Sequence, residues 1–171
     1  VLAYDDAGRD KGNADKSAKD VEGYDRDNEA MIAWIKKQPW FSGHIGAMGF
    51  CIGGHLAFRA ALQPDVEATA CFYATDLHTT VIPNKPNQHS MDRLKDIKGE
   101  LLMIWGKQDN HIPDAGRKTV YDKMLDAKLA FTWHEFNGQH AFMRDEGERY
   151  DPELAFLGYE LALKLFQRRL A

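Results

Sequence analysis

The stretch "GFCIGG", from Gly49 to Gly54, places a cysteine among small residues, directly after an apolar run and directly before a predicted helix. Where a strand turns sharply into a helix at a nucleophile, the residues two before and two after the nucleophile pass close to its side chain and backbone, and glycine relieves those contacts. Gly49 and Gly53 occupy these two positions around Cys51, and Gly54 leaves room for the helix to approach the sheet. The stretch therefore predicts a strand, a strained turn that presents Cys51, and a helix.

A cysteine in this setting is typical of a nucleophile. The N-terminus of a helix stabilises an anion through its dipole and its unpaired N–H groups, which favours the thiolate. The backbone N–H of Ile52 is the predicted donor to an oxyanion. The alternative is that Cys51 is a small core residue in a tight turn, because Gly-x-Cys-x-Gly is a short motif. The other cysteine, Cys71, lies among apolar neighbours, where we expect it only to pack.

Outward from this turn, apolar runs alternate with amphipathic segments. We predict strands over 44–50, 68–74, 100–106 and 130–136, and helices over 52–62, 114–127 and from Asp151-Pro152 onward. The last helix carries an apolar stripe that we expect to pack on the sheet: Phe156, Tyr159, Leu163, Phe166 and Leu170. This alternation predicts an α/β fold with a mostly parallel, doubly wound sheet, in a single domain over residues 1–171.

The N-terminal part is harder to assign. Residues 1–4, "VLAY", are typical of the tail of a strand, and residues 5–28 of a long, charged surface excursion. A helix is predicted from about 27 to 37, with Met31, Trp34 and Ile35 on one face. The chain starts at Val1 inside an apolar run, so we expect either a removed start or a fragment of a longer protein.

Composition excludes several classes of protein. Among 171 residues, 44% are hydrophobic and 28% charged, with a formal net charge of −4, so neither a nucleic-acid partner nor an interaction tail is predicted. No run approaches the roughly 18 apolar residues of a membrane span. The two cysteines form neither a disulfide framework nor a CxxC zinc motif, which favours a reducing, cytoplasmic setting.

Two further residues complete a catalytic pattern. Asp109 follows the run "LLMIWG" and His140 follows "FTWHEF", each in a glycine-containing turn just past a predicted strand. In α/β-hydrolases the order along the chain is nucleophile, acid, histidine, each at the carboxyl end of a strand. We therefore predict that Cys51, Asp109 and His140 converge. Asp76 is a rival acid. His111 beside His140 lacks a third ligand, so no metal is predicted.

With these residues in place, the sequence resembles the dienelactone hydrolase family, carboxymethylenebutenolidase-like enzymes of the α/β-hydrolase superfamily. The segments that carry the resemblance are "YDDAGR", "GFCIGGHLAF", "LLMIWGKQDNHIP", "NGQHAFMRDE" and "YDP". The resemblance implies an α/β-hydrolase fold and a Cys-His-Asp triad. It also implies hydrolysis of an activated ester or lactone through an acyl-enzyme, without a cofactor. Arg9 and Arg144 match the arginines that hold the substrate carboxylate in the family, although a solvated arginine in a polar loop is the alternative.

The chain departs from the family at its start, because members carry roughly 70 further residues there, in keeping with ordinary domain size. That part supplies the first strands, including the one beside "HIGAMGF", and the second oxyanion donor. An open apolar edge is expected to seek a partner. Further N-terminal residues, an associated or swapped second copy, and a reduced fold are the three explanations.

Three other functions remain open at this point. The first is a general esterase or thioesterase with another substrate. The second is a non-catalytic α/β-hydrolase fragment that acts in binding or assembly. The third is redox sensing by Cys51, for which no resolving cysteine lies nearby.

Overall fold

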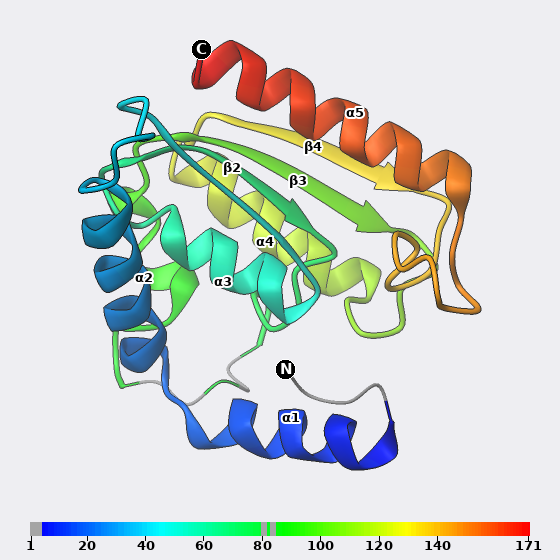
Figure 1. The fold of residues 1–171 in the computed structure, drawn as a ribbon. Helices are drawn as coiled ribbons and strands as arrows, with labels where there is room; N and C mark the ends of the chain where they lie inside the picture. Colours follow the sequence, from blue (N-terminus) through cyan, green and yellow to red (C-terminus); the bar gives the residue numbers. More distant parts are fainter. Residues whose placement is uncertain (1–4, 80–81, 83–84) are drawn as a thin grey trace.

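A computed structural model describes residues 5–79, 82 and 85–171. Within them, one sheet contains four parallel strands in the order β1-β2-β3-β4 (Figure 1). The strands are β1 (Ile45–Phe50), β2 (Val66–Phe72), β3 (Glu100–Gly106) and β4 (Phe131–Phe136). This confirms the predicted α/β fold with a parallel sheet.

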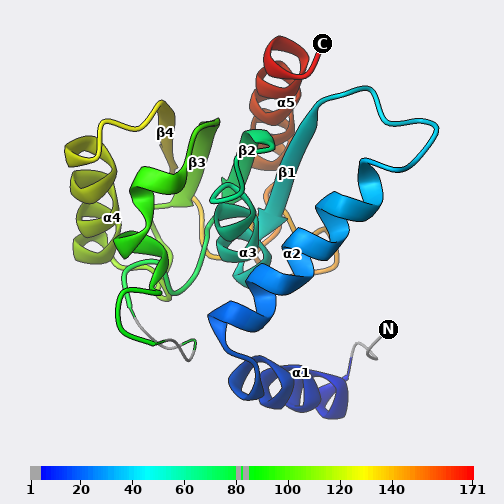
Figure 2. The same cartoon turned by 90° about the vertical axis from the view of Figure 1, so that its left-hand side faces the viewer.

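Helices cover both faces of the sheet, as a parallel sheet requires. α3 (Ile52–Ala60) and α4 (Asp114–Asp126) connect neighbouring strands on one face, and α5 (Pro152–Arg169) lies on the other (Figures 1 and 2). Each of these predicted strands and helices is found within about two residues of its predicted bounds, as expected for boundaries read from pattern alone. The carboxylate of Asp151 accepts the N–H groups of Glu153 and Leu154 and so caps α5.

The core lies between the sheet and its helices. β2 and β3 are the central strands and are almost wholly buried, because parallel strands with helices on both faces lose contact with water on both sides. Trp105, Phe72 and Phe58 are among the largest fully buried side chains. Cys71 is fully buried in the same cluster. No helix in the described ranges has the length and apolar character needed to cross a bilayer.

The predicted loop over residues 5–28 is wrong. The segment forms α1 (Asp6–Ala18), which lies at the surface without a buried residue, and the first half of α2 (Val21–Ile35). Two aspartates of this charged segment are helix caps: Asp5 accepts the N–H of Gly8 at 2.7 Å, and Asp20 accepts the N–H of Gly23 at 2.8 Å. The predicted strand over 1–4 lies outside the described residues.

The apolar face identified in the sequence is not the buried face of α2. Met31 and Trp34 are each 57% exposed, and Ile35 is only half-buried, whereas Ile32 is buried. The helix begins six residues earlier than predicted, and its inner face is set by Val21, Asp25 and Ile32. The buried face of α2 therefore includes a charged residue, Asp25. A pattern of hydrophobic residues alone does not identify such a face.

The apolar stripe of α5 does not face the sheet either. Phe156 is 67% and Leu163 59% exposed, and Tyr159 is largely exposed, although Phe166 and Leu170 pack partly on the core. The buried face is made of small residues with one leucine: Ala155, Gly158, Ala162 and Leu165. A Cβ at Gly158 would lie 3.1 Å from the ring of Phe72, so small residues allow the close approach that large ones prevent.

Within the described residues β1 and β4 are the two edge strands of the sheet. β1 pairs only with β2, so one of its sides is unpaired (Figure 2). Met48 on β1 is 47% exposed, and the ring of its neighbour Phe50 lies 6.3 Å from that of Tyr159 on α5. The contact between Phe50 and Tyr159 thus joins this edge strand to α5.

A buried ion pair joins α2 to α3. The guanidinium of Arg59, with no exposed surface, donates two hydrogen bonds to the carboxylate of Asp25, at 2.6 and 2.7 Å. Arg93 donates a further bond to Asp25 at 2.9 Å. Removal of one partner from such a pair leaves the other charge buried and uncompensated.

Asp25→Ala is therefore expected to lower the free energy of unfolding by about 3–5 kcal/mol. Asp27→Ala, on the same helix, removes only the exposed ion pair with Lys19 and is expected to cost about 1 kcal/mol or less. Urea unfolding of both variants and the unmodified protein measures the difference. Equal losses in the two variants would contradict the assigned role of Asp25.

Candidate active site

The turn between β1 and α3 holds Cys51 in a strained conformation. Its φ is 56° and its ψ −123°, in a region that residues with a Cβ rarely adopt. The backbone is fixed on both sides by the segment of β2: the N–H of Cys51 donates to the Phe72 carbonyl at 3.1 Å, and the N–H of Thr75 donates to the Cys51 carbonyl at 3.2 Å. The predicted strained turn is therefore present, with the sulfur at the carboxyl end of β1.

The glycines around this turn differ in what they do. A Cβ on Gly49 would lie 1.9 Å from the carbonyl oxygen of Gly53, so only glycine fits at position 49. A Cβ on Gly54 would lie 2.8 Å from the Phe72 carbonyl oxygen, which agrees with the predicted close approach of helix to sheet. The prediction for Gly53 is wrong: a Cβ there meets no atom within 4 Å, so no contact requires glycine at this position.

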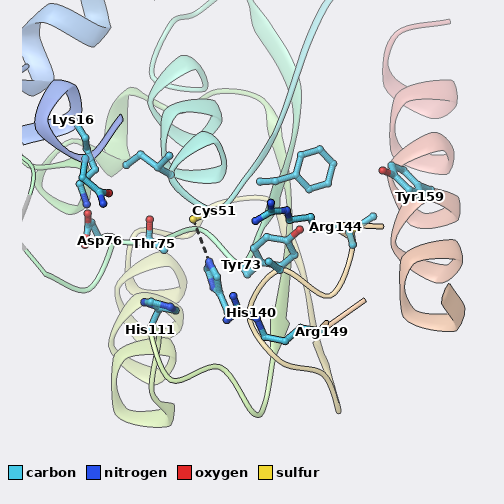
Figure 3. A pocket seen from close by; sticks show the side chains of 15 residues that line it. Lys16, Cys51, Tyr73, Thr75, Asp76, His111, His140, Arg144, Arg149 and Tyr159 are labelled. Atoms are coloured by element: carbon cyan, nitrogen blue, oxygen red, sulfur yellow. Dashed lines mark hydrogen bonds between the residues drawn. The ribbon is translucent and has the colours of Figure 1, made fainter. Parts of the chain in front are cut away.

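Three residues that follow three different strands form one hydrogen-bonded line, from the sulfur of Cys51 through His140 to Asp109. Nε2 of His140 lies 3.1 Å from the sulfur of Cys51, and Nδ1–H of His140 donates to Oδ2 of Asp109 at 2.7 Å (Figure 3). His140 is 6% and Asp109 4% exposed. The other oxygen of Asp109 accepts the backbone N–H groups of His111 and Ile112, at 2.8 and 3.2 Å. The structure thus brings the predicted Cys51, Asp109 and His140 together.

The charges of Cys51 and His140 stabilise each other. Burial alone would raise the pKa of the Cys51 thiol, but the hydrogen bond and charge of His140, with the N–H of Ile52, hold it below its ordinary value. Burial alone would lower the pKa of His140, yet its hydrogen bonds to Asp109 and Cys51 raise it to about 9. Each shift favours a thiolate beside an imidazolium, and the two groups titrate as a pair.

Asp76, the rival acid, has a hydrogen-bond partner other than His140. Asp76 lines the same cavity, but its Oδ1 accepts a bond from the hydroxyl of Thr79 at 3.3 Å, and its buried Oδ2 has no hydrogen-bond partner among the described residues. The carboxylate bonded to His140 is that of Asp109. The described residues also contain no group of three or more histidine, cysteine or acidic side chains that could hold a metal ion.

A cavity of about 640 Å³ opens over the sulfur, and Ile52 and Tyr73 help to line it. Three cations line it, Lys16, Arg144 and Arg149, against the single carboxylate of Asp76. Figure 3 shows the two arginines on the side of Tyr73 and His140, and Lys16 beside Asp76 on the other side. The side with the arginines therefore carries positive charge without a lining carboxylate.

The two predicted arginines have different positions. Arg144 lines the cavity, whereas Arg9 lies on α1, 67% exposed at its side chain and paired with Asp6 at 3.1 Å. Arg9 is not among the lining residues, and its role in substrate binding stays a prediction.

Sequence reasoning missed several residues of the cavity. Tyr73 packs edge-on against His140, with ring centroids 5.1 Å apart, and Thr75 lies next to Cys51 (Figure 3). Both belong to the segment that ends β2, so the rule that pointed to Asp76 would also have found them. Arg149 and Lys16 had no such signal, because charged residues surround both in the sequence.

A nucleophile on a strand-to-helix turn, followed by an acid and a histidine at later ends of a parallel sheet, defines an α/β-hydrolase. Residues 5–170 match the model of the dienelactone hydrolase family, and the chain belongs to that family. The resemblance predicted from the five sequence segments is therefore confirmed.

The curated relatives that this chain matches are longer than the chain itself. It is 36% identical over 177 residues to the Saccharomyces cerevisiae protein named "Putative carboxymethylenebutenolidase", which covers 99% of this chain and 65% of that protein. It is 28% identical over 147 residues to the carboxymethylenebutenolidase of Pseudomonas putida, covering 85% of this chain and 58% of that enzyme. The chain thus spans less than two thirds of the length of these relatives.

Solved structures show the same fold. The crystal structure of a dienelactone hydrolase-like promiscuous phosphotriesterase from metagenomic libraries matches with a TM-score of 0.78 and 19% identity, over 98% of this chain and 70% of that one. At this level of identity the likeness is one of fold alone.

Gly49→Ala is expected to destabilise the turn by about 1–3 kcal/mol or more, because its Cβ would meet a backbone carbonyl that cannot move alone. Gly53→Ala is the matched control and is expected to keep or raise stability, since alanine favours a helix by about 1 kcal/mol over glycine. Urea unfolding of the two variants measures this difference. A tolerated alanine at 49 would show that the turn does not depend on that contact.

Proposed function

We propose that this protein hydrolyses an activated carboxylic ester or lactone of the dienelactone type through an acyl-enzyme on Cys51. The observation that carries the proposal is the continuous hydrogen-bonded line from the Cys51 sulfur through His140 to Asp109, open to a cavity. Membership of the dienelactone hydrolase family and the names of the relatives support the same reaction.

In this mechanism the thiolate of Cys51 attacks the carbonyl carbon. A C–S bond forms, the π electrons of the carbonyl move to its oxygen, and the N–H of Ile52 stabilises the resulting oxyanion. The imidazolium of His140 gives its proton to the leaving alkoxide as the C–O bond breaks. His140 then takes a proton from water, which attacks the thioester and releases the acid and the thiolate. Asp109 holds the imidazole in the required orientation throughout.

The nucleophile limits which esters react. A thiolate is a good leaving group, so the tetrahedral intermediate returns to substrate unless the alkoxide also leaves easily. Conjugated or strained lactones and aryl esters satisfy this condition. The reaction uses no cofactor.

The charge of the cavity favours an anionic substrate. The chain carries a formal net charge of −4, yet its cavity is lined by three cations and one carboxylate. Among the described residues Arg149 has no ion pair, and both it and Arg144 belong to the segment that follows His140. A guanidinium fork meets a carboxylate with two bonds, so this pair is our proposed contact for a substrate carboxylate.

The free thiol and the unpaired sheet edge also bear on where the protein is located and how it assembles. A free thiol nucleophile works in a reducing compartment, so we propose a cytoplasmic location. We also propose a single domain, with the open edge of β1 covered by further N-terminal residues or by a second copy of the chain, because an unpaired apolar edge favours pairing.

Cys51→Ala is expected to abolish hydrolysis of p-nitrophenyl acetate, because it removes the attacking atom. Cys71→Ala is the matched control: this second cysteine is buried away from the cavity, and its loss is expected to lower stability while turnover is retained. Initial rates at 405 nm measure both. Turnover that survives Cys51→Ala would contradict the proposed role of Cys51 as the nucleophile, whereas a parent protein without turnover would favour a binding or assembly role.

Arg149→Ala and Arg144→Ala are each expected to raise KM for an anionic lactone about tenfold, as for the loss of one charge-assisted contact. Hydrolysis of a neutral aryl ester is expected to change little. Arg26→Ala, an exposed arginine on α2, serves as the control. Equal effects on the anionic and neutral substrates would favour a general esterase or thioesterase instead.

A further inference from the structure

His111 carries a second imidazole at the wall of the cavity, which has no part in the acyl transfer described above. Its ring centroid lies 4.6 Å from that of His140, with 56° between the two ring planes. The residue is exposed and lines the cavity that opens over Cys51. Figure 3 shows His111 on one side of His140 and the two arginines, Arg144 and Arg149, on the other.

The backbone and the side chain of His111 make separate contacts. Its backbone N–H donates to Oδ1 of Asp109 at 2.8 Å and so helps to fix that carboxylate. Its ring contacts His140, but within the part of the chain that the structure describes neither ring nitrogen has a hydrogen-bond partner. An imidazole has at least one N–H donor in either protonation state, so this ring offers a donor to the cavity whatever its charge.

The leaving oxygen of the substrate must come close to this part of the wall. In the proposed mechanism His140 delivers its proton to that oxygen from Nε2, the nitrogen that lies 3.1 Å from the sulfur of Cys51. A proton donor has to be within about 3 Å of the atom that receives the proton. The oxygen therefore lies against the ring of His140 while the C–O bond breaks, and His111 is the imidazole beside that ring.

We propose that His111 is a further catalytic residue, whose ring N–H donates a hydrogen bond to the leaving oxygen while His140 protonates it. The proposal rests on the proposed acyl-transfer function. The electron pair of the C–O bond goes to the oxygen, the proton comes from His140, and His111 keeps its own proton. A donor that is already in place stabilises the negative charge that develops on the oxygen.

The nucleophile makes such a donor useful. A thiolate leaves the tetrahedral intermediate more easily than an alkoxide does, so the forward reaction depends on how well the leaving oxygen is stabilised. A nitrophenolate is stable without help, whereas a phenolate or an enolate gains more from a hydrogen bond. His111 is therefore expected to extend the reaction to esters with less acidic leaving groups, on the side of the cavity away from the two arginines.

The test uses a series of acetates that differ only in the leaving group: p-nitrophenyl, p-chlorophenyl, phenyl and p-methoxyphenyl acetate. All of them give the same acetyl-enzyme, so kcat/KM compares only the steps up to loss of the leaving group. His111→Phe keeps a ring beside His140 and the backbone N–H to Asp109, but it removes the donor. In this variant kcat/KM is expected to stay within about twofold for p-nitrophenyl acetate and to fall on the order of tenfold for phenyl acetate.

Two amide variants test whether the donor itself is responsible. His111→Asn and His111→Gln place an N–H donor near the positions of Nδ1 and Nε2, and at least one is expected to bring phenyl acetate back to within about threefold of the parent protein. His44→Phe is the matched control, since this exposed histidine contacts Glu67 and does not line the cavity. Because His111 is exposed, the variants at this position are expected to fold.

Three results would overturn the proposal. The first is a loss of equal size for all the acetates in His111→Phe, which would mean that His111 acts only through the position of His140. The second is an unchanged kcat/KM across the series. The third is a selective loss that neither amide restores. Failure of the proposed function looks different: the parent protein itself would hydrolyse none of the acetates, and the role of His111 would fall with it.

Discussion

The strained backbone at Cys51 is the constraint on which the site depends. A residue with a Cβ held at positive φ costs on the order of 1–3 kcal/mol, and it persists only where its surroundings fix it. Here the Phe72 carbonyl, the Thr75 N–H and the contact that excludes a side chain at Gly49 provide that fixation. Because the turn and the central strand β2 are bonded together, the sulfur keeps a defined position relative to every later strand end.

Electrostatics then makes the three side chains mutually dependent. Burial opposes the charged form of both Cys51 and His140, so neither charge would be stable there alone. Asp109 stabilises the imidazolium, the imidazolium stabilises the thiolate, and two backbone N–H groups fix the carboxylate. The interaction energy therefore belongs to Cys51, His140 and Asp109 together and cannot be divided among the three residues.

Sequence alone predicted the parallel sheet and the meeting of three distant residues, because strand-helix alternation and the carboxyl-edge rule are strong regularities. Sequence analysis failed where one type of residue is compatible with two structural roles. The charged stretch over residues 5–28 suggested a loop, but its Asp5 and Asp20 cap helices, and large side chains on α5 suggested the buried face that Gly158 and its small neighbours occupy. The position of Arg149 could not be predicted, since it depends on how one irregular segment folds back over the cavity.

That segment holds the residues that we propose for recognition, apart from those that we propose for the chemistry. The three proposed catalytic residues sit at strand ends, whose positions the sheet fixes, whereas Arg144 and Arg149 follow His140 in the irregular connection to α5. Loops tolerate substitution better than strand ends do, so the charge that a substrate meets can change while the line from Cys51 to Asp109 remains. The described residues thus place Cys51 at a fixed strand end, beside two arginines on a loop that tolerates substitution. We therefore expect the charged residues of this loop to determine which substrates such a fold accepts.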